Sequence, residues 1–139
     1  DDIGKFNEAL KTGEDTEFWI RTGLKYPVVF LREPLATLKV VPESLSTTNR
    51  SHFQAMDFEA FQSQVDGNVY AKKFLNQNMF ISALRYKLIN KRSAFKDLKK
   101  QLDFSLLSFK QKLLLFLPRG ILKLLIAMRT SYSSKKRYF

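Results

Sequence analysis

The chain has 139 residues, enough for one domain, and carries 24 Lys and Arg against 13 Asp and Glu, a formal charge of +11. It contains no cysteine and one histidine, which excludes a disulfide framework and a thiolate metal site. The excess of positive charge favours negatively charged partners, such as an anionic membrane surface or nucleic acid.

An acidic pair opens the first predicted helix. Glu14 and Asp15 follow a glycine, and the apolar residues after them recur at helical spacing, which predicts a helix over residues 14–24. A helix N-terminus favours negative charge, and an ionised carboxylate there can accept a proton from a substrate hydroxyl. The structural alternative is that Asp15 is only an N-cap and that Arg21 only pairs with Glu17 one helical turn earlier.

Two apolar runs follow this helix. Val28–Leu31 and Leu35–Val41 are rich in β-branched residues and are separated by Arg32-Glu33-Pro34, which predicts two strands around a tight turn. The polar stretch from Leu45 to Ser51 then predicts a linker to a helical extension.

Residues 6–36 contain several short motifs. Together they point to a protein family more specifically than any one of them does alone. The segment reads Phe-Asn-Glu-Ala-Leu-Lys-Thr-Gly-Glu-Asp-Thr-Glu-Phe-Trp-Ile-Arg over residues 6–21, followed by Lys25-Tyr26-Pro27 and Glu33-Pro34-Leu35-Ala36. It resembles the late catalytic region of bacterial family 2 glycosyltransferases over about the first 50 residues. The sequence departs from the family pattern at Val41, where many relatives carry a histidine. Whatever that histidine contributes is therefore absent here or comes from another position.

This resemblance implies an inverting transferase of the GT-A fold. The Asp15 position would act as the base on the acceptor hydroxyl, assisted by Glu14, while Trp19 and Arg21 would bind the acceptor. The expected fold class is mainly α with a small β element. Residues 1–45 would be the C-terminal piece of a GT-A α/β catalytic domain, with its helix and strand pair, and a helical tail would follow.

The donor-binding half of such an enzyme has no counterpart in the sequence. A GT-A transferase needs a preceding nucleotide-binding part of roughly one further domain's length, and neither a Gly-rich phosphate loop nor an Asp-x-Asp pair is visible. Magnesium or manganese is expected for the full-length enzyme, with no ion bound by this part. We therefore expect the chain to be the C-terminal part of a larger enzyme and to be inactive alone.

Residues 46–107 have a helical period. Phe58, Phe61 and Val65 form a short stripe that ends at Asp66-Gly67-Asn68. A longer stripe follows, and Ser93 is placed to cap a further helix. These patterns predict a helical hairpin or bundle, with packing as the default role of its aromatic residues. The residues of the longer stripe are Tyr70, Phe74, Ile81, Leu84 and Leu88.

Residues 108–139 predict two basic amphipathic helices. Ser108 and Gln111 fit a capping box, and Pro118 suits the first turn of a second helix. Lysines and arginines interrupt the apolar run, so neither helix supplies the about 20 apolar residues that a membrane span needs. The pattern is that of an interfacial helix, in which each basic residue near an anionic surface contributes on the order of 1 kcal/mol. The residues predicted to bind the membrane are Lys110, Lys112, Arg119, Lys123, Lys135, Lys136 and Arg137.

The same periodicity would serve a core helix whose lysines extend to solvent, so the pattern alone leaves both interpretations open. The resemblance favours the membrane, because the run over residues 109–118 is similar to the ends of bacterial transferases that build surface polysaccharides.

Sequence and resemblance together predict sugar transfer from a nucleotide-sugar donor to a saccharide or lipid-linked acceptor, with inversion. The enzyme would lie in the cytoplasm, peripheral at the inner face of the cytoplasmic membrane. The alternative is a non-enzymatic basic helical domain that binds nucleic acid or an anionic membrane. Nucleic-acid binding is the weaker alternative, since no zinc finger, helix-turn-helix glycine turn or RNP-like strand accompanies the charge.

Overall fold

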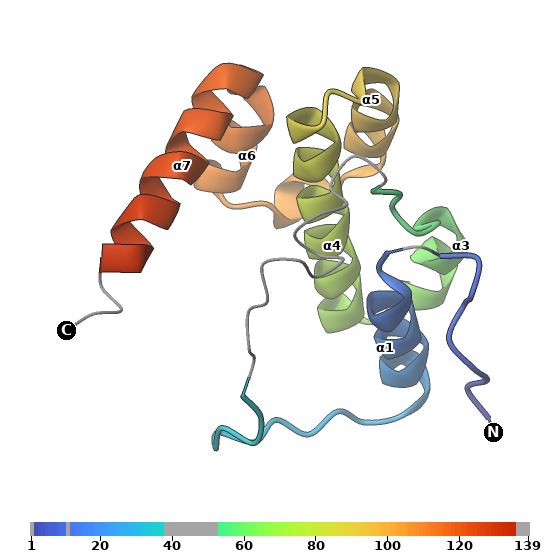
Figure 1. Cartoon of the computed structure of the whole chain (residues 1–139). Coiled ribbons are helices and arrows are strands. Elements are labelled where there is room, and N and C mark those ends of the chain that lie inside the picture. The colour runs from blue at the N-terminus through green and yellow to red at the C-terminus, as the bar shows by residue number, and fades with distance from the viewer. Residues whose placement is uncertain (1, 11, 38–52, 136–139) are drawn as a thin grey trace. The chain divides into compact units, whose positions relative to one another are not determined.

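The computed structural model describes residues 2–10, 12–37 and 53–135, with side chains as far as Met128, and the regular structure in these ranges is helical (Figure 1). The prediction of a mainly α protein is therefore confirmed. Two 3-10 helices are η2 (Ser63–Val65) and η3 (Phe104–Leu106). The α-helices are α1 (Glu14–Lys25), α3 (Glu59–Gln62), α4 (Val69–Leu88), α5 (Arg92–Gln101), α6 (Phe109–Phe116) and α7 (Arg119–Lys135).

The structure does not show the predicted strand pair. Residues 28–37 form no strand, and Val28–Leu31 is exposed to solvent, with Phe30 84% exposed. The remaining residues of the second predicted strand, 38–41, and the predicted linker at 45–51 lie outside the described residues. A two-stranded hairpin is marginal in water unless further strands or a helix cover it, which accords with the lack of strand structure over residues 28–37.

The chain forms two compact units, Asp1–Leu75 and Asn76–Phe139, with the boundary inside α4. The predicted limits at residues 45 and 107 do not coincide with this boundary. The two units differ sharply in charge: the first contains 9 Lys and Arg and 11 Asp and Glu, and the second contains 15 Lys and Arg and 2 Asp. The positive excess of the whole chain therefore belongs to the second unit.

The first unit buries one side of α1 together with α3 and η2. The predicted stripe of Phe58, Phe61 and Val65 is buried, and Ile20 of α1 is buried as well. The hydroxyl of Thr12 donates a hydrogen bond to the carbonyl oxygen of Gln54 at 2.9 Å, which joins the segments that precede the two helices.

The predicted break at Asp66–Asn68 is confirmed. Gly67 has a φ of 84°, in the left-handed region that favours glycine. The side chain of Asn68 then accepts a hydrogen bond from the backbone N–H of Ala71 at 3.0 Å, at the start of α4. The chain can reverse here because glycine supplies the positive φ and asparagine satisfies a free amide of the new helix.

Helix α4 does not bury the face that the sequence predicted. Tyr70, Phe74 and Ile81 of the predicted stripe are exposed. The residues of α4 that are buried are Leu75, Asn76, Met79, Phe80, Ala83 and Tyr86. Apolar residues occur on all sides of this helix, so periodicity could not choose between the faces.

In the second unit, a buried side-chain amide connects α4 to the segment after α5. Asn76 is 2% exposed, and its amide nitrogen donates to the carbonyl oxygen of Asp103 at 3.0 Å. Its amide oxygen accepts from the backbone N–H of Asp103 at 2.9 Å. Both polar groups of the buried side chain are thereby satisfied, and α4 is fixed against η3.

Two helices, α6 and α7, lie in the range where two were predicted, as far as residue 135, where the described residues end. The hydroxyl of Ser108 accepts from the N–H of Gln111 at 3.3 Å, and the Gln111 side chain accepts from the N–H of Ser108 at 2.8 Å. This is the predicted capping box of α6. Pro118 immediately precedes α7, and its carbonyl oxygen accepts the first hydrogen bond of that helix from Leu122 at 3.0 Å.

Candidate functional site

Asp15 lies in the first turn of α1, and its side chain is exposed. The helix begins after Gly13, which has a φ of 84° and caps it without a side-chain hydrogen bond. The carboxylate of Asp15 accepts from the backbone N–H of Thr16 at 2.6 Å. Asp15 is therefore not the N-cap, and the alternative in which it has only that role is wrong. It is a solvent-facing carboxylate at the helix end where negative charge is favoured.

Trp19 follows Asp15 by one helical turn and is 61% exposed. Its ring meets the ring of Phe18 edge to face, with centroids 5.9 Å apart and an interplanar angle of 77°. Residues four apart are neighbours on a helix surface, so the indole and the carboxylate of Asp15 lie on the same side of α1. A flat aromatic surface beside a hydrogen-bond acceptor suits a ligand with an apolar face and hydroxyl groups.

The two glutamates of the same turn are less accessible. One carboxylate oxygen of Glu14, Oε2, is buried and has no hydrogen-bond partner among the described residues. Glu17 is 8% exposed and faces the interior of the first unit. An unpaired buried carboxylate oxygen costs free energy, so Glu14 is a group in need of a donor.

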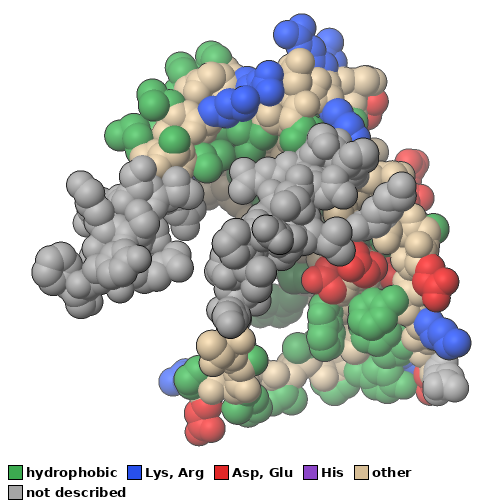
Figure 2. Space-filling view, viewed as in Figure 1, with side chains coloured by type: hydrophobic (Ala, Val, Ile, Leu, Met, Phe, Trp, Pro, Cys, Tyr) green, Lys and Arg blue, Asp and Glu red, His purple; other side chains and the backbone are tan. Residues whose placement is uncertain are grey.

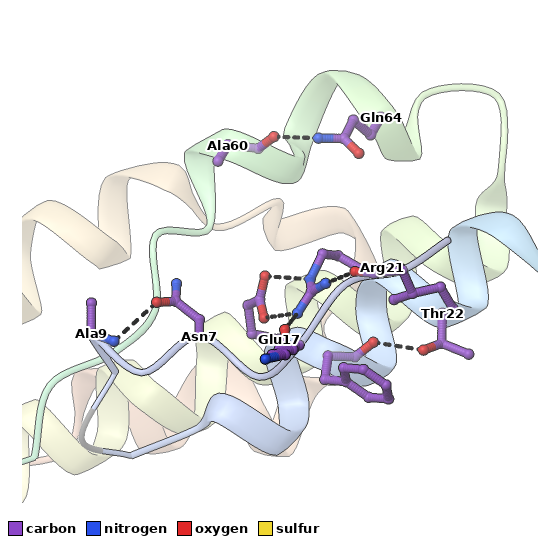
Figure 3. A network of polar contacts seen from close by, with 10 residues as sticks. Asn7, Ala9, Glu17, Arg21, Thr22, Ala60 and Gln64 are labelled. Carbon is purple, nitrogen blue, oxygen red and sulfur yellow. Dashed lines mark hydrogen bonds and ion pairs between the residues drawn. The ribbon is translucent and has the colours of Figure 1, made fainter. Parts of the chain in front are cut away.

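Arg21 holds the N-terminal segment against α1 (Figure 3). Its Nε and Nη2 donate to the two carboxylate oxygens of Glu17 at 2.7 Å and 2.9 Å. Nη2 also donates to the carbonyl oxygen of Lys5 at 2.8 Å, and Nη1 donates to the carbonyl oxygen of Ile3. The alternative pairing of Arg21 with Glu17 is thus confirmed, and all three guanidinium nitrogens are engaged within the first unit. Acceptor binding by Arg21 would require some of these contacts to open.

The residues predicted to bind a membrane differ in their exposure to solvent. Lys110 and Lys123 are exposed, whereas Lys112 and Arg119 are half-buried. The Nε of Arg119 donates to the carbonyl oxygen of Leu88 at 3.0 Å, at the end of α4. The side chain of Lys135 and the whole of Lys136 and Arg137 lie outside the described residues.

Helices α6 and α7 expose an apolar surface, which covers the upper left of Figure 2. Leu115 and Leu122 are buried, so one side of each helix contributes to the core of the second unit. Eight large apolar side chains of these helices are 41% to 80% exposed. These residues, the apolar surface of α6 and α7, are Phe109, Leu113, Phe116, Ile121, Leu124, Leu125, Ile126 and Met128.

A basic cavity in the second unit was not predicted from the sequence. It has a volume of about 400 Å³ and is lined by Lys87, Asn90, Arg92, Phe95, Lys96 and Arg119. Burial, and secondarily the nearby charge of Lys99, lower the pKa of Lys87 below its ordinary value. Arg92 and Lys96 are one turn apart, a spacing that could have indicated a shared basic face. The approach of Lys87 and Arg119 to that face depends on how the helices pack.

No family model, curated protein or solved structure matches the chain. In the part that the structure describes, no helix is long and apolar enough to cross a membrane. Within the same residues, no three His, Asp or Glu side chains are grouped so that they could hold a metal ion.

Proposed function

We propose that the chain is the C-terminal part of an inverting glycosyltransferase in which Asp15 is the general base. One observation carries the proposal: Asp15 and Trp19 are both exposed on one side of α1, one turn apart. The resemblance of residues 6–36 to family 2 transferases supports the same roles. Transfer would serve surface polysaccharide synthesis on a saccharide or lipid-linked acceptor.

In this mechanism the acceptor sugar stacks on Trp19 and presents a hydroxyl to Asp15. The hydroxyl oxygen attacks the anomeric carbon of the donor sugar while Asp15 takes its proton. The bond from that carbon to the nucleoside diphosphate breaks, and the configuration inverts because the attack comes from the opposite side. The donor and its magnesium or manganese ion would be held by a preceding part of the enzyme.

The test is the Asp15→Asn substitution in the longer enzyme that includes the donor-binding part, with sugar transfer followed by mass spectrometry. We expect turnover to fall by about 10²-fold or more, because the amide cannot accept the proton, while donor binding stays unchanged. Asp66→Asn is the matched control, since it removes an exposed carboxylate from the same unit without touching α1. Near-normal turnover of Asp15→Asn would exclude the base role.

A second function, association with an anionic membrane surface, is favoured by the apolar surface of α6 and α7. Exposed apolar side chains beside lysines are the features by which interfacial helices bind lipid. The net positive charge of the second unit would add attraction to anionic headgroups. This function is compatible with sugar transfer to a lipid-linked acceptor.

A further inference from the structure

The cavity lined by Lys87, Asn90, Arg92, Phe95, Lys96 and Arg119, called the basic pocket from here on, has four cationic lining residues and no acidic one. Its volume of about 400 Å³ lies within the range of small-molecule sites, roughly 300 to 1,000 Å³. All six residues belong to the second unit, so the pocket is formed by that unit alone.

A tight turn between α4 and α5 creates the pocket. Asn90 has a φ of 66°, and the N–H of Lys91 donates to the carbonyl oxygen of Tyr86 at 2.9 Å, which ends α4 in a Schellman motif. Helix α5 begins at Arg92, immediately after this turn, and its N-cap residue makes no side-chain hydrogen bond. The N–H of Arg92 donates to the carbonyl oxygen of Asn90 at 3.1 Å, and the positive end of the α5 dipole lies at the pocket.

Two of the four cations of the pocket, Lys87 and Arg119, are held in place by hydrogen bonds to backbone carbonyl oxygens. The Nζ of Lys87 donates to the carbonyl oxygen of Leu115 at 2.6 Å and lies 5.1 Å from the centre of the Phe95 ring. The Nε of Arg119 is bound to the carbonyl oxygen of Leu88, as described above. Neither side chain has an ion pair with an acid among the described residues, and the same holds for Arg92 and Lys96. Like charges brought together in this way repel one another unless an anion joins them.

We propose that the basic pocket binds a phosphate group, in the form of a phosphate monoester or a diphosphate. Such a group carries close to two negative charges or more and several acceptor oxygens, which matches a site with two guanidinium groups and two ammonium groups. A single carboxylate would leave most of these cations without a partner. Burial, and secondarily the charge of Lys99, lower the pKa of Lys87, and a bound anion would favour its protonated form.

The experiment measures binding of inorganic pyrophosphate to the full chain by titration calorimetry at physiological ionic strength. We expect one pyrophosphate per chain, with affinity at least about tenfold weaker in Arg92→Gln/Lys96→Gln, because two charge-assisted contacts are lost. Both residues are exposed, so the fold should persist. The matched control is Lys73→Gln/Lys100→Gln, which removes two exposed charges outside the pocket and should change affinity by less than about twofold.

A parallel arm distinguishes a soluble phosphate from a lipid headgroup. In this arm, flotation of the chain is measured with two kinds of vesicle at equal lipid charge. One contains phosphatidic acid, a phosphate monoester, and the other contains phosphatidylglycerol, a phosphate diester. Pyrophosphate binding that depends on Arg92 and Lys96 supports a soluble ligand. Selective loss of flotation on phosphatidic acid in the pocket variant supports a lipid headgroup. The proposal is overturned if neither probe distinguishes the pocket variant from the control. Neither arm uses a sugar donor, so the result is independent of the role of Asp15.

Discussion

The guanidinium of Arg21 shows how one side chain orders the start of the first unit. Its contacts reach Glu17 one turn back and two carbonyl oxygens of the N-terminal segment, Ile3 and Lys5. The side chains of Arg21 and Glu17 are 25% and 10% exposed, so the pair is partly removed from water. Ion pairs in such positions become costly when one partner is lost, because the other charge remains desolvated.

Replacing Glu17 by Gln should therefore lower the free energy of unfolding by about 2 kcal/mol. The measurement is urea unfolding followed by tryptophan fluorescence, for which Trp19 on the same helix is the single reporter in the chain. Glu59→Gln, an exposed glutamate of the same unit, is the control and should change stability by less than about 0.5 kcal/mol. Equal effects of the two substitutions would contradict the role assigned to Arg21 and Glu17.

At the level of the element, α6 is short, and its start depends on the capping box. Eight residues make a helix too short to be stable alone, so it needs its cap and the burial of Leu115. Ser108 and Gln111 together satisfy two backbone amides that would otherwise lack partners. The cap thus helps to position the exposed residues of α6 that form part of the apolar surface.

Ser108→Ala should lower the free energy of unfolding by about 1 kcal/mol, since the N–H of Gln111 loses its acceptor. Thermal unfolding followed by circular dichroism would measure the change. Ser108→Asp retains a capping oxygen and should recover most of the loss. If the aspartate variant were as unstable as the alanine variant, the hydroxyl would not be acting as a cap.

For the whole molecule, the dominant property is the separation of charge between the units. The first unit has a small negative balance, whereas the second has 15 basic residues against 2 acidic ones. The apolar surface of α6 and α7 belongs to the same basic unit. Charge alone would attract either lipid or nucleic acid, but exposed apolar side chains gain free energy only from an apolar environment.

Membrane binding should therefore require apolar residues as well as charge. Leu124→Glu/Met128→Glu should reduce flotation with phosphatidylcholine–phosphatidylglycerol vesicles to the lipid-free level, because two exposed apolar contacts of α7 are lost and two negative charges added. The control Val69→Glu/Tyr70→Glu makes the same change at exposed residues of α4 in the first unit and should retain flotation. Unaltered flotation of the α7 variant would refute the lipid role, and binding to duplex DNA with a steep salt dependence would favour nucleic acid.

Local interactions made much of this protein predictable from its sequence. The capping box at Ser108, the break at Gly67 and the pairing of Arg21 with Glu17 involve residues at most four apart, so the spacing alone indicates the contact. The mainly α character follows for the same reason, since helical periodicity is a local signal. The strand prediction at Val28–Leu31 was the exception, because a strand is stable only with partners that lie elsewhere.

The tertiary structure decided the features that depend on residues distant in sequence. One such feature is which face of α4 is buried. Because apolar residues occur on every side of this helix, the periodicity of the sequence could not indicate that face. The tertiary structure also brought Arg119 to the end of α4 and so completed the basic pocket across 31 residues of chain. The exposure of Asp15 and Trp19 belongs to this class as well, because burial depends on what packs against a helix and not on the helix itself. Hydrogen bonds and turns are specified over a few residues, whereas packing and the gathering of charges are specified by the whole chain.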